Sequence, residues 1–396
     1  MTEIKNFDFS NKRVLLRCDF NLPVNQDEIL GNLRLERTKK TIDFLKEKKA
    51  KIILLSHFDD PQKISNLRER KEKCSFEKLL PRIEKVLGKI KFVPEVIGKK
   101  VEKEIEKIEP GDILLIENLR FEKGEEENDE EFARELSKLG DVYINEAFSA
   151  SHREHASIVS LPKFLPSFLG FSFQEEVDNL SRISQSFTRP LVIIIGGVKI
   201  SSKLKFIEKF IEIADHILFG GKVANEILKI KGIYIGKPLA EEDDEIIEKI
   251  KKIQLTDPKI HLPVDAIASL DETGNLTKRI VAPAMVRKEE EIYDIGPDTI
   301  YTWKQIISES KTVFWSGPLG FYENPNFELG TKEIASFITS NQKIFSLVGG
   351  GDTIAALSKF NLLDKFSYIS TGGSAMLEFL SQNTLPGIEA QKKYKV

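Results

Sequence analysis

Short apolar runs of strand-forming residues recur along this chain and alternate with charged segments of helical periodicity. The runs cover residues 14–16, 51–55, 113–116, 142–144, 191–195, 217–219, 312–314 and 344–348. Continuously apolar strands are typical of parallel sheets that are buried on both faces, and strands that alternate with helices predict helices covering those faces. The sequence therefore predicts an α/β fold.

The length and the distribution of arginine and glycine indicate two domains with different chemistry. A chain of 396 residues exceeds what one hydrophobic core usually serves. Residues 173–186 are polar and helix-like, so we predict a first domain over residues 1–172, an interdomain helix and hinge over 173–188, and a second domain over 189–379. Of 14 arginines, 10 precede residue 181, whereas 17 of 24 glycines follow it. Arginine binds small anions and glycine loops bind nucleotide phosphates, so the two halves are expected to divide these tasks.

Composition excludes several classes of protein. The net charge of -3 gives no general attraction to nucleic acid or to an anionic membrane. No stretch approaches ~18 consecutive apolar residues, and residues 1–8 lack a signal-peptide core, so we expect neither a membrane span nor secretion. The only cysteines, Cys18 and Cys74, are too few for a disulfide framework. A cytoplasmic protein is the expectation.

A glycine-rich turn at residues 349–353 follows one of the apolar runs and precedes a helix-like segment. Its glycines let backbone N–H groups approach an anion at a helix N-terminus. Asp352 is a carboxylate of the kind that binds Mg²⁺ together with a nucleotide. The alternative is a strand-to-helix turn that needs glycine only for close packing.

Three other turns of the second half have related compositions. Gly197 precedes Lys199 and Lys203, two lysines four residues apart that we expect on one helical face at a phosphate. Gly220-Gly221 follows the next strand, and Thr371-Gly372-Gly373-Ser374 precedes a helix. No G-x-x-x-x-G-K-[ST], G-x-G-x-x-G or G-x-S-x-G pattern occurs, which argues against a P-loop, a nicotinamide dehydrogenase and a serine hydrolase.

A further segment, which begins at Trp315, combines small and apolar residues in a way that suits an adenosine. It includes Gly317 and Pro318 and ends at Glu323, whose carboxylate is suited to ribose hydroxyls.

Polar and charged side chains follow four strands of the first half. They are Asp19 and Asn21, His57, Arg120, and the pair His152 and Arg153, with Arg34 in a polar loop after the first strand. The carboxyl ends of parallel strands meet at one edge, where α/β sheets bind ligands. The alternative is that Asp and Asn serve the turns. His152 and His155 lack a third metal ligand, so an anion-binding loop is favoured over a metal pair.

In their order along the chain, these motifs resemble those of the phosphoglycerate kinases. The matching segments are Arg17-x-Asp19-x-Asn21, Ser56-His57, Glu117-Asn118-Leu119-Arg120-Phe121 with Gly124-Glu125-Glu126, His152-Arg153-x-His155-Ala156-Ser157, Gly196-Gly197-x-Lys199, Leu262-Pro263-Val264-Asp265, Asp294-Ile295-Gly296-Pro297, Trp315-x-Gly317-Pro318, residues 349–353, and Leu385-Pro386-Gly387-Ile388-Glu389-Ala390. Each motif is weak alone, but their combined order is specific and spans nearly the whole chain.

The resemblance implies two doubly wound, Rossmann-like parallel-sheet domains joined by a hinge helix. The first would bind 3-phosphoglycerate and the second ATP or ADP with Mg²⁺, while a tail over residues 380–396 packs back on the first domain. The implied reaction is reversible phosphoryl transfer between 1,3-bisphosphoglycerate and ADP, with hinge closure joining the two sites. The implied protein is a cytoplasmic monomer with small-molecule substrates and neither a nucleic-acid nor a membrane partner.

The resemblance also implies roles for individual residues. The acid substrate would contact Asp19, Asn21, Arg34, His57, Asp60, Arg120, His152 and Arg153. The nucleotide would contact Gly197, Lys199, Lys203, Gly221, Gly296, Gly317, Pro318, Glu323, Gly350, Gly351, Asp352 and Thr353, and Asp352 would bind the metal. Arg34, Lys203, Gly351 and Gly373 would stabilise charge on the transferred phosphoryl group.

The chain departs from the family pattern after His57. The family usually continues with a small hydrophobic residue, Gly, Arg and Pro, whereas this chain has Phe58-Asp59-Asp60-Pro61. A carboxylate therefore replaces a phosphate-binding arginine. Either Asp60 repels the substrate, or the loop turns it outward and Lys63 substitutes; a catalytically weakened nucleotide-binding protein is the alternative function.

Four smaller departures are Glu146 for aspartate, Lys222 for a third glycine, Ser316 for asparagine and Ser374 for glycine. Lys222 would either crowd the adenine slot or add a phosphate contact, and the sequence leaves both open.

Overall fold

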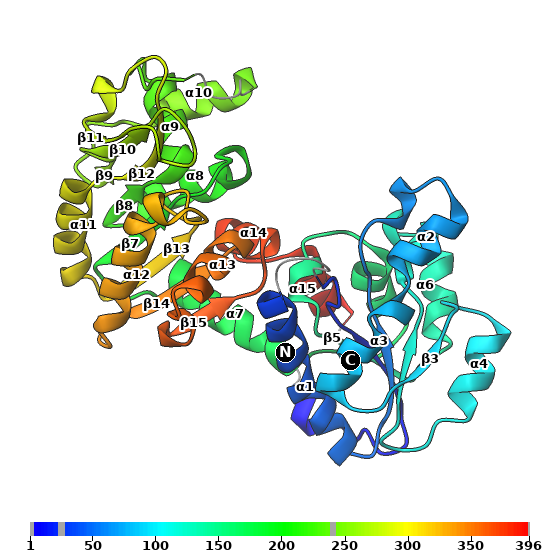
Figure 1. The fold of residues 1–396 in the computed structure, drawn as a ribbon. Helices are drawn as coiled ribbons and strands as arrows, with labels where there is room; N and C mark the ends of the chain where they lie inside the picture. The colour runs from blue at the N-terminus through cyan, green and yellow to red at the C-terminus, as the bar shows by residue number, and fades with distance from the viewer. Residues whose placement is uncertain (1–3, 23–27, 238–242, 395–396) are drawn as a thin grey trace. The chain divides into compact units, whose positions relative to one another are not determined.

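The computed structural model describes residues 4–22, 28–237 and 243–394 and divides into two compact units (Figure 1). The N-terminal unit comprises Met1–Asp178 and Thr384–Val396, and the C-terminal unit comprises Asn179–Asn383. Residues 1–3 of the expected first domain and residues 395–396 of the expected tail lie outside the described residues. Residues 1–3 also belong to the segment 1–8, for which the sequence predicted no signal peptide. The predicted fold class, two parallel-sheet α/β domains, is confirmed.

The N-terminal unit contains a six-stranded sheet in the order β3-β4-β2-β1-β5-β6, with every neighbouring pair parallel. The strands are β1 (Arg13–Arg17), β2 (Lys51–Leu55), β3 (Lys91–Val93), β4 (Ile113–Ile116), β5 (Val142–Asn145) and β6 (Ser167–Leu169). The helices are α1 (Glu28–Glu47), α2 (Leu67–Cys74), α3 (Leu80–Leu87), α4 (Lys99–Glu106), α5 (Lys123–Glu126), α6 (Glu130–Ser137) and α15 (Pro386–Lys393).

Two separate cores explain why the central strands of this sheet have apolar residues on both faces. Leu16, Ile52 and Leu54 contribute to a core that α1 and α3 complete, whereas Leu15 and Ile53 contribute to a second core with α4 and α6. Successive side chains of a strand point to opposite faces, so alternate residues enter different cores. Both faces of the sheet are therefore buried under helices, as in doubly wound folds.

The C-terminal unit contains a second six-stranded parallel sheet in the order β15-β14-β13-β7-β8-β9. Its strands are β7 (Leu191–Ile195), β8 (His216–Phe219), β9 (Ile260–His261), β13 (Thr312–Ser316), β14 (Phe345–Gly349) and β15 (Tyr368–Ser370). The helices are α8 (Leu204–Ile213), α9 (Gly221–Ile230), α10 (Asp244–Lys252), α11 (Pro297–Glu309), α12 (Leu329–Ser340), α13 (Gly351–Lys359) and α14 (Ser374–Gln382).

A small antiparallel sheet in the same unit was not predicted from the sequence. Its strands are β10 (Ala266–Ser269), β11 (Lys278–Val281) and β12 (Glu291–Ile295), in the order β11-β10-β12. One of its faces packs through Ala266, Ala268 and Ile292 on Leu228 of α9. The sheet contributes Ala266 and residues 291–295 to the wall of the cavity described below.

Helix α7 (Phe171–Ser184) includes the point where the chain passes from one unit to the other, between Asp178 and Asn179. It coincides with much of the predicted interdomain helix. Helix α15, near the red end of the colour scale in Figure 1, lies on the N-terminal unit, where Gly387 N donates to Ser151 O at 3.0 Å. Within the described ranges, none of the helices has the length and apolar character that a membrane crossing requires.

Candidate functional site

Most of the predicted acid-substrate residues follow the carboxyl ends of strands in the N-terminal unit. Asp19 and Asn21 follow β1, His57 follows β2 and Arg120 follows β4, while His152 and Arg153 follow β5. The chain order reverses between β1 and β5, and ligands of doubly wound sheets bind at such a reversal. The strand order therefore brings these polar residues to one edge of the sheet.

Arg34 lies on helix α1, so the expectation of a polar loop at this position is wrong. Gly31 and Asn32 are weak helix formers that favoured a loop. The buried residues Leu35, Ile42 and Leu45 fix this segment as a helix against the sheet. From α1 the Arg34 guanidinium reaches the first loop, with Nη1 lying 2.8 Å from Asn21 O and 3.2 Å from Asp19 Oδ2.

The side chain of Arg120 is nearly buried, and two groups orient it. Its Nη1 donates to Asp59 O at 2.6 Å, and its Nε lies 3.2 Å from Glu126 Oε1. Burial lowers the pKa of the guanidinium, which Glu126 opposes, but arginine remains charged in proteins. Arg120 thus places a permanent positive charge beside the loop that carries Asp59 and Asp60.

That loop differs from the family pattern, and its conformation is defined by local contacts. Asp59 has a positive φ of 55°, and its N–H donates to Asn21 Oδ1 at 3.0 Å. Asp60 Oδ2 lies 2.8 Å from Lys63 Nζ, and the Lys63 side chain is 83% exposed. Lys63 therefore neutralises Asp60 at the surface, and whether Asp60 faces a bound phosphate stays a prediction.

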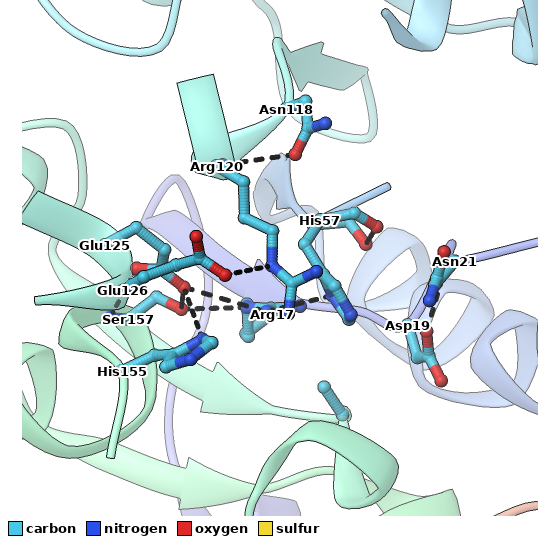
Figure 2. A network of polar contacts seen from close by, with 12 residues as sticks. Arg17, Asp19, Asn21, His57, Asn118, Arg120, Glu125, Glu126, His155 and Ser157 are labelled. Atoms are coloured by element: carbon cyan, nitrogen blue, oxygen red, sulfur yellow. Dashed lines mark hydrogen bonds and ion pairs between the residues drawn. The ribbon is translucent and has the colours of Figure 1, made fainter. Parts of the chain in front are cut away.

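A buried polar network extends from His57 to the loop after β5 (Figure 2). Arg17, fully buried, has Nη2 3.2 Å from His57 Nδ1 and donates from Nε to Ser157 Oγ at 2.9 Å. Glu125, also fully buried, accepts from Ser157 N at 2.9 Å and from Ser157 Oγ at 2.6 Å. Reasoning from the sequence assigned no role to Arg17, Glu125 or Ser157. A signal existed for Arg17 alone, because this charged residue directly follows the apolar run 14–16.

The three histidines of this unit favour their neutral forms. Burial, together with the charge of Arg17, places the pKa of His57 well below its ordinary value. The same causes lower the pKa of His155 to about 3, and burial and Arg153 lower that of His152. His152 Nε2 lies 3.4 Å from Arg153 Nε. Among the residues that the structure describes, no group of three or more His, Cys, Asp or Glu side chains is placed to hold a metal ion.

The glycine turns of the C-terminal unit meet at the corresponding reversal of strand order, between β7 and β13. Gly196 N donates to Ser316 O at 2.9 Å, and Gly197 N donates to Pro318 O at 2.8 Å. Gly317 has a φ of 95°, and a Cβ at that position would lie 2.2 Å from the carbonyl carbon of Gly196. The two backbone segments approach so closely that a side chain at Gly196 or Gly317 would displace the facing backbone.

A cavity of about 280 Å³ adjoins these turns. Its wall includes five of the predicted nucleotide residues, which are Gly197, Gly221, Pro318, Glu323 and Asp352. The remainder of the wall is mostly apolar, as expected for a site that holds a planar ring and a few directed polar groups.

Two polar contacts on this wall were not predicted. Lys222 Nζ lies 3.0 Å from Glu291 Oε1 across the cavity wall. Asp294 is buried, which raises its pKa to about 8, and it accepts from Gly330 N at 2.8 Å at the start of α12. Lys222 is thus held by an acidic partner, which neither of the two sequence interpretations had included.

The turn at residues 349–353 begins helix α13. Gly350 precedes the helix with a φ of 99°, and a Cβ at Gly351 would meet no heavy atom within 4 Å. Asp352 lies in the first helical turn, and Thr353 Oγ1 accepts from Gly317 N at 2.7 Å. The helix N-terminus is therefore open to an anion, and Thr353 links it to the turn after β13.

Lys199 and Lys203 do not share a helical face, so that expectation is wrong. Lys199 is exposed in the loop after β7, and Lys203 ends the short 3-10 helix Ser201–Lys203 before α8 begins at Leu204. The Lys203 side chain reaches the glycine turn instead, because a Cβ at Gly197 would lie 3.2 Å from Lys203 Nζ. Burial lowers the pKa of Lys203, and the charge of Asp352 opposes this shift.

Gly296 and Gly373 differ in their surroundings. A Cβ at Gly296 would lie 2.2 Å from Asp265 Oδ2, and Asp265 caps α11 by accepting from Thr299 N at 2.8 Å. Close packing thus explains Gly296, which is not among the residues that line the cavity. A Cβ at Gly373, just before α14, would meet nothing within 4 Å. A phosphate role for Gly296 and a catalytic role for Gly373 stay predictions.

Fold and sites together define a two-domain α/β protein, with an arginine- and histidine-rich edge in one unit and a glycine-lined cavity in the other. The chain belongs to the phosphoglycerate kinase family, whose model matches residues 4–383.

Individual relatives agree over nearly the full chain. Phosphoglycerate kinases of Wolbachia (strain wRi) and Borrelia hermsii are 38% and 37% identical, each over 98% of this chain and 98% and 99% of their own. Among solved structures, phosphoglycerate kinase from Coxiella burnetii has a TM-score of 0.84 at 33% identity, covering 98% of both chains. The enzyme from Pyrococcus horikoshii has a TM-score of 0.85 at 28% identity, covering 100% of this chain and 99% of its own.

Proposed function

We propose that this chain catalyses reversible phosphoryl transfer between 1,3-bisphosphoglycerate and ADP, giving 3-phosphoglycerate and ATP. One observation carries this proposal, namely the different residues that the two sheets gather where their strand order reverses. In the N-terminal unit these are arginine and histidine side chains, and in the C-terminal unit they are glycine turns beside a cavity with Asp352 on its wall. The first arrangement suits a small phosphorylated acid and the second a nucleotide. Membership of the family supports the same reaction.

The acid substrate would be held by charge and by directed hydrogen bonds. Arg120 is nearly buried, so its charge is poorly screened by water. Arg34 is oriented by Asp19 and Asn21, which reduces the entropy lost when it binds an anion. Arg153 extends this positive surface in the loop after β5. We assign the carboxylate and phosphate of 3-phosphoglycerate to this group, with His57 as a further donor.

The nucleotide would lie in the cavity of the C-terminal unit with its phosphates toward the start of α13. Glu323 is exposed on the wall, where its carboxylate can accept from ribose hydroxyls. The residues present fit a magnesium nucleotide, because Asp352 offers one carboxylate beside an open helix N-terminus. Asp352 would hold Mg²⁺, which when bound neutralises part of the charge on the phosphates.

No general base is needed, because the acceptor of the reverse reaction is already a carboxylate. Catalysis then consists of in-line positioning and of stabilising charge on the transferred group. We assign that charge to Arg34, to Lys203 and to the N–H groups of Gly351 and Gly373. The two substrates bind to different units, so direct transfer requires the units to close, and α7 is the segment that we assign as the hinge.

The same assignment implies a monomer that acts in the cytoplasm on small molecules alone. The family, the net charge of -3 and the cysteine usage support this part of the proposal. The alternative, a nucleotide-binding protein weakened by Asp60, is less favoured, because the ion pair with Lys63 already offsets the Asp60 charge.

A coupled assay for ADP formation from ATP and 3-phosphoglycerate tests the proposal. We expect turnover that requires Mg²⁺ and that Asp352→Asn lowers while raising the Mg²⁺ concentration needed for half-maximal rate. Asp364→Asn, which changes an exposed carboxylate in the short helix Leu363–Lys365, is the matched control. Nucleotide binding without turnover would favour the alternative, and equal effects of the two variants would remove Asp352 as the metal ligand.

A further inference from the structure

Arg17 makes three side-chain hydrogen bonds although water does not reach it. Besides those to Ser157 and His57, its Nη1 donates to Cys18 O at 2.5 Å. Glu125 Oε1, equally buried, lies 3.8 Å from Arg17 Nη2 and supplies the opposite charge. A buried charge with this many directed partners has a defined orientation, because turning away from any one of them would leave a buried polar atom unpaired.

The hydrogen bond between Arg17 and His57 determines which ring nitrogen of His57 carries the proton. All guanidinium nitrogens of arginine donate hydrogen bonds and none accepts. His57 Nδ1, 3.2 Å from Arg17 Nη2, must therefore be the acceptor, and in a neutral ring the proton then lies on Nε2.

The surroundings of His57 oppose its positively charged form. The charged or titratable groups that act most strongly on the ring are Arg17 of β1, Arg120 after β4, and Arg153 and His155 after β5. Every charge in this set is positive or absent. A neutral ring avoids their repulsion and still offers one donor.

That donor is available to a ligand. His57 is only 7% exposed, and no acceptor for its Nε2–H occurs within the part of the chain that the structure describes. Among the described residues, Nε2 is not one of the fully buried polar atoms that lack a partner, so water reaches this donor and an oxygen of a ligand can take the place of that water.

We propose that Arg17 is a positioning residue that fixes His57 as the neutral Nε2–H tautomer, so that His57 donates a hydrogen bond to an oxygen of the acid substrate. The identity of that substrate rests on the proposed function, whereas the tautomer does not. In Figure 2 the chain of contacts runs from Glu125 through Ser157 and Arg17 to His57. Because Ser157 Oγ donates to Glu125, its lone pair is available to accept from Arg17 Nε.

Nitrogen NMR of the wild-type protein tests the tautomer directly. Long-range proton–nitrogen correlation at pH 7 separates a protonated ring nitrogen from an unprotonated one, and the spectrum of His57→Gln assigns the His57 signals. We expect a protonated Nε2, an unprotonated Nδ1, and a shift of the Nε2–H signal on addition of 3-phosphoglycerate. A protonated Nδ1, a charged ring, or an Nε2–H signal that ignores the acid would overturn the proposal.

Arg17→Lys tests whether Arg17 imposes this state. Lysine keeps the charge but is shorter and lacks the planar fork, so His57 Nδ1 should no longer have a fixed donor. We expect KM for 3-phosphoglycerate to rise about tenfold, KM for ATP to change less than about twofold, and the His57 ring nitrogens to show a mixture of the two neutral tautomers in the NMR spectrum.

Arg13→Lys is the matched control, because Arg13 lies at the other end of β1 and pairs with Asp141 at 2.6 Å. It should change neither KM nor the His57 signals. An Arg17→Lys protein with an unchanged His57 spectrum and an unchanged KM for 3-phosphoglycerate would overturn the role of Arg17. If that variant does not fold, the wild-type spectrum still decides which ring nitrogen of His57 carries the proton. A wild-type protein without kinase activity that still shows the Nε2–H tautomer would refute the proposed function and leave this assignment standing.

Discussion

Replacing Gly317 by alanine should destabilise the C-terminal unit and impair its proposed nucleotide site. Gly317 follows β13 at the strand-order reversal and has a φ of 95°, which a residue with a side chain adopts only with strain. Its Cβ would lie 2.2 Å from both the carbonyl carbon and the oxygen of Gly196 and 2.7 Å from Gly197 N. All three neighbouring atoms belong to the backbone, so a rotamer change cannot relieve the overlap.

The magnitude follows from two separate costs. The left-handed conformation costs alanine about 1 to 2 kcal/mol, and crowding of packed backbone costs about 1 to 3 kcal/mol. Together they lower the free energy of unfolding by about 2 to 5 kcal/mol. For a unit the size of Asn179–Asn383, that corresponds to a fall in Tm of about 5 to 15 °C.

Calorimetry with and without ADP and Mg²⁺ measures both consequences. The matched control is Gly351→Ala, because Gly351 is the first residue of α13 and its Cβ would meet no heavy atom within 4 Å. That variant should keep the wild-type Tm or exceed it, since alanine favours a helix. A Gly317→Ala protein that melts within about 2 °C of wild type would refute the claim that backbone contact between the two turns requires glycine.

Three further outcomes follow from the N-terminal unit. Asp60→Arg should lower KM for 3-phosphoglycerate about 10- to 100-fold by adding a charged hydrogen bond. An unchanged or higher KM in initial-rate kinetics would show that this side chain does not face the phosphate. Arg34→Ala should lower kcat about 100- to 1,000-fold with a modest change in KM, and a surviving kcat contradicts its charge-stabilising role. Burial lowers the pKa of His57, and that of His155 to about 3, whereas both titrate near ~6.5 when unfolded. The free energy of unfolding should therefore fall as pH drops below ~6.5, by up to about 1.4 kcal/mol per pH unit for each histidine; urea curves at several pH values that show no such fall would contradict the neutral, buried state.

The strands that the sequence revealed are those in the middle of each sheet. All eight apolar runs form strands, and the parallel strands that were missed are β3, β6, β9 and β15. These four are the outermost strands of the two sheets. An edge strand is short and partly exposed, as in the exposed-to-buried pattern of Lys91–Val93, so it lacks the continuous apolar run that marks a strand buried on both sides.

The candidate site was predictable where it depends on strand ends and obscure where it depends on distant contacts. The strand-end positions of Asp19, His57 and Arg120 follow from the order of elements alone. The network of Arg17 joins residues 140 positions apart, as in its bond to Ser157, and no local pattern specifies that pairing. Arg34 was placed in a loop because local propensity favours one, whereas packing of α1 on the sheet determines a helix.

The two sites differ in how the protein builds them, and this difference determines what mutations can reveal. The proposed acid site consists of side chains such as Arg34 and Arg120, which are oriented by their neighbours but contribute little to the cores. Removing one should therefore separate catalysis from stability. The proposed nucleotide site consists largely of backbone at turns such as that of Gly317, and the contacts of these turns with one another hold the unit together. A substitution at such a turn changes nucleotide binding only by displacing backbone, so the loss of nucleotide affinity and the fall in Tm should increase together. A variant that loses affinity but keeps the wild-type Tm must instead act through one of the few polar side chains on the cavity wall, such as Asp352 or Lys222.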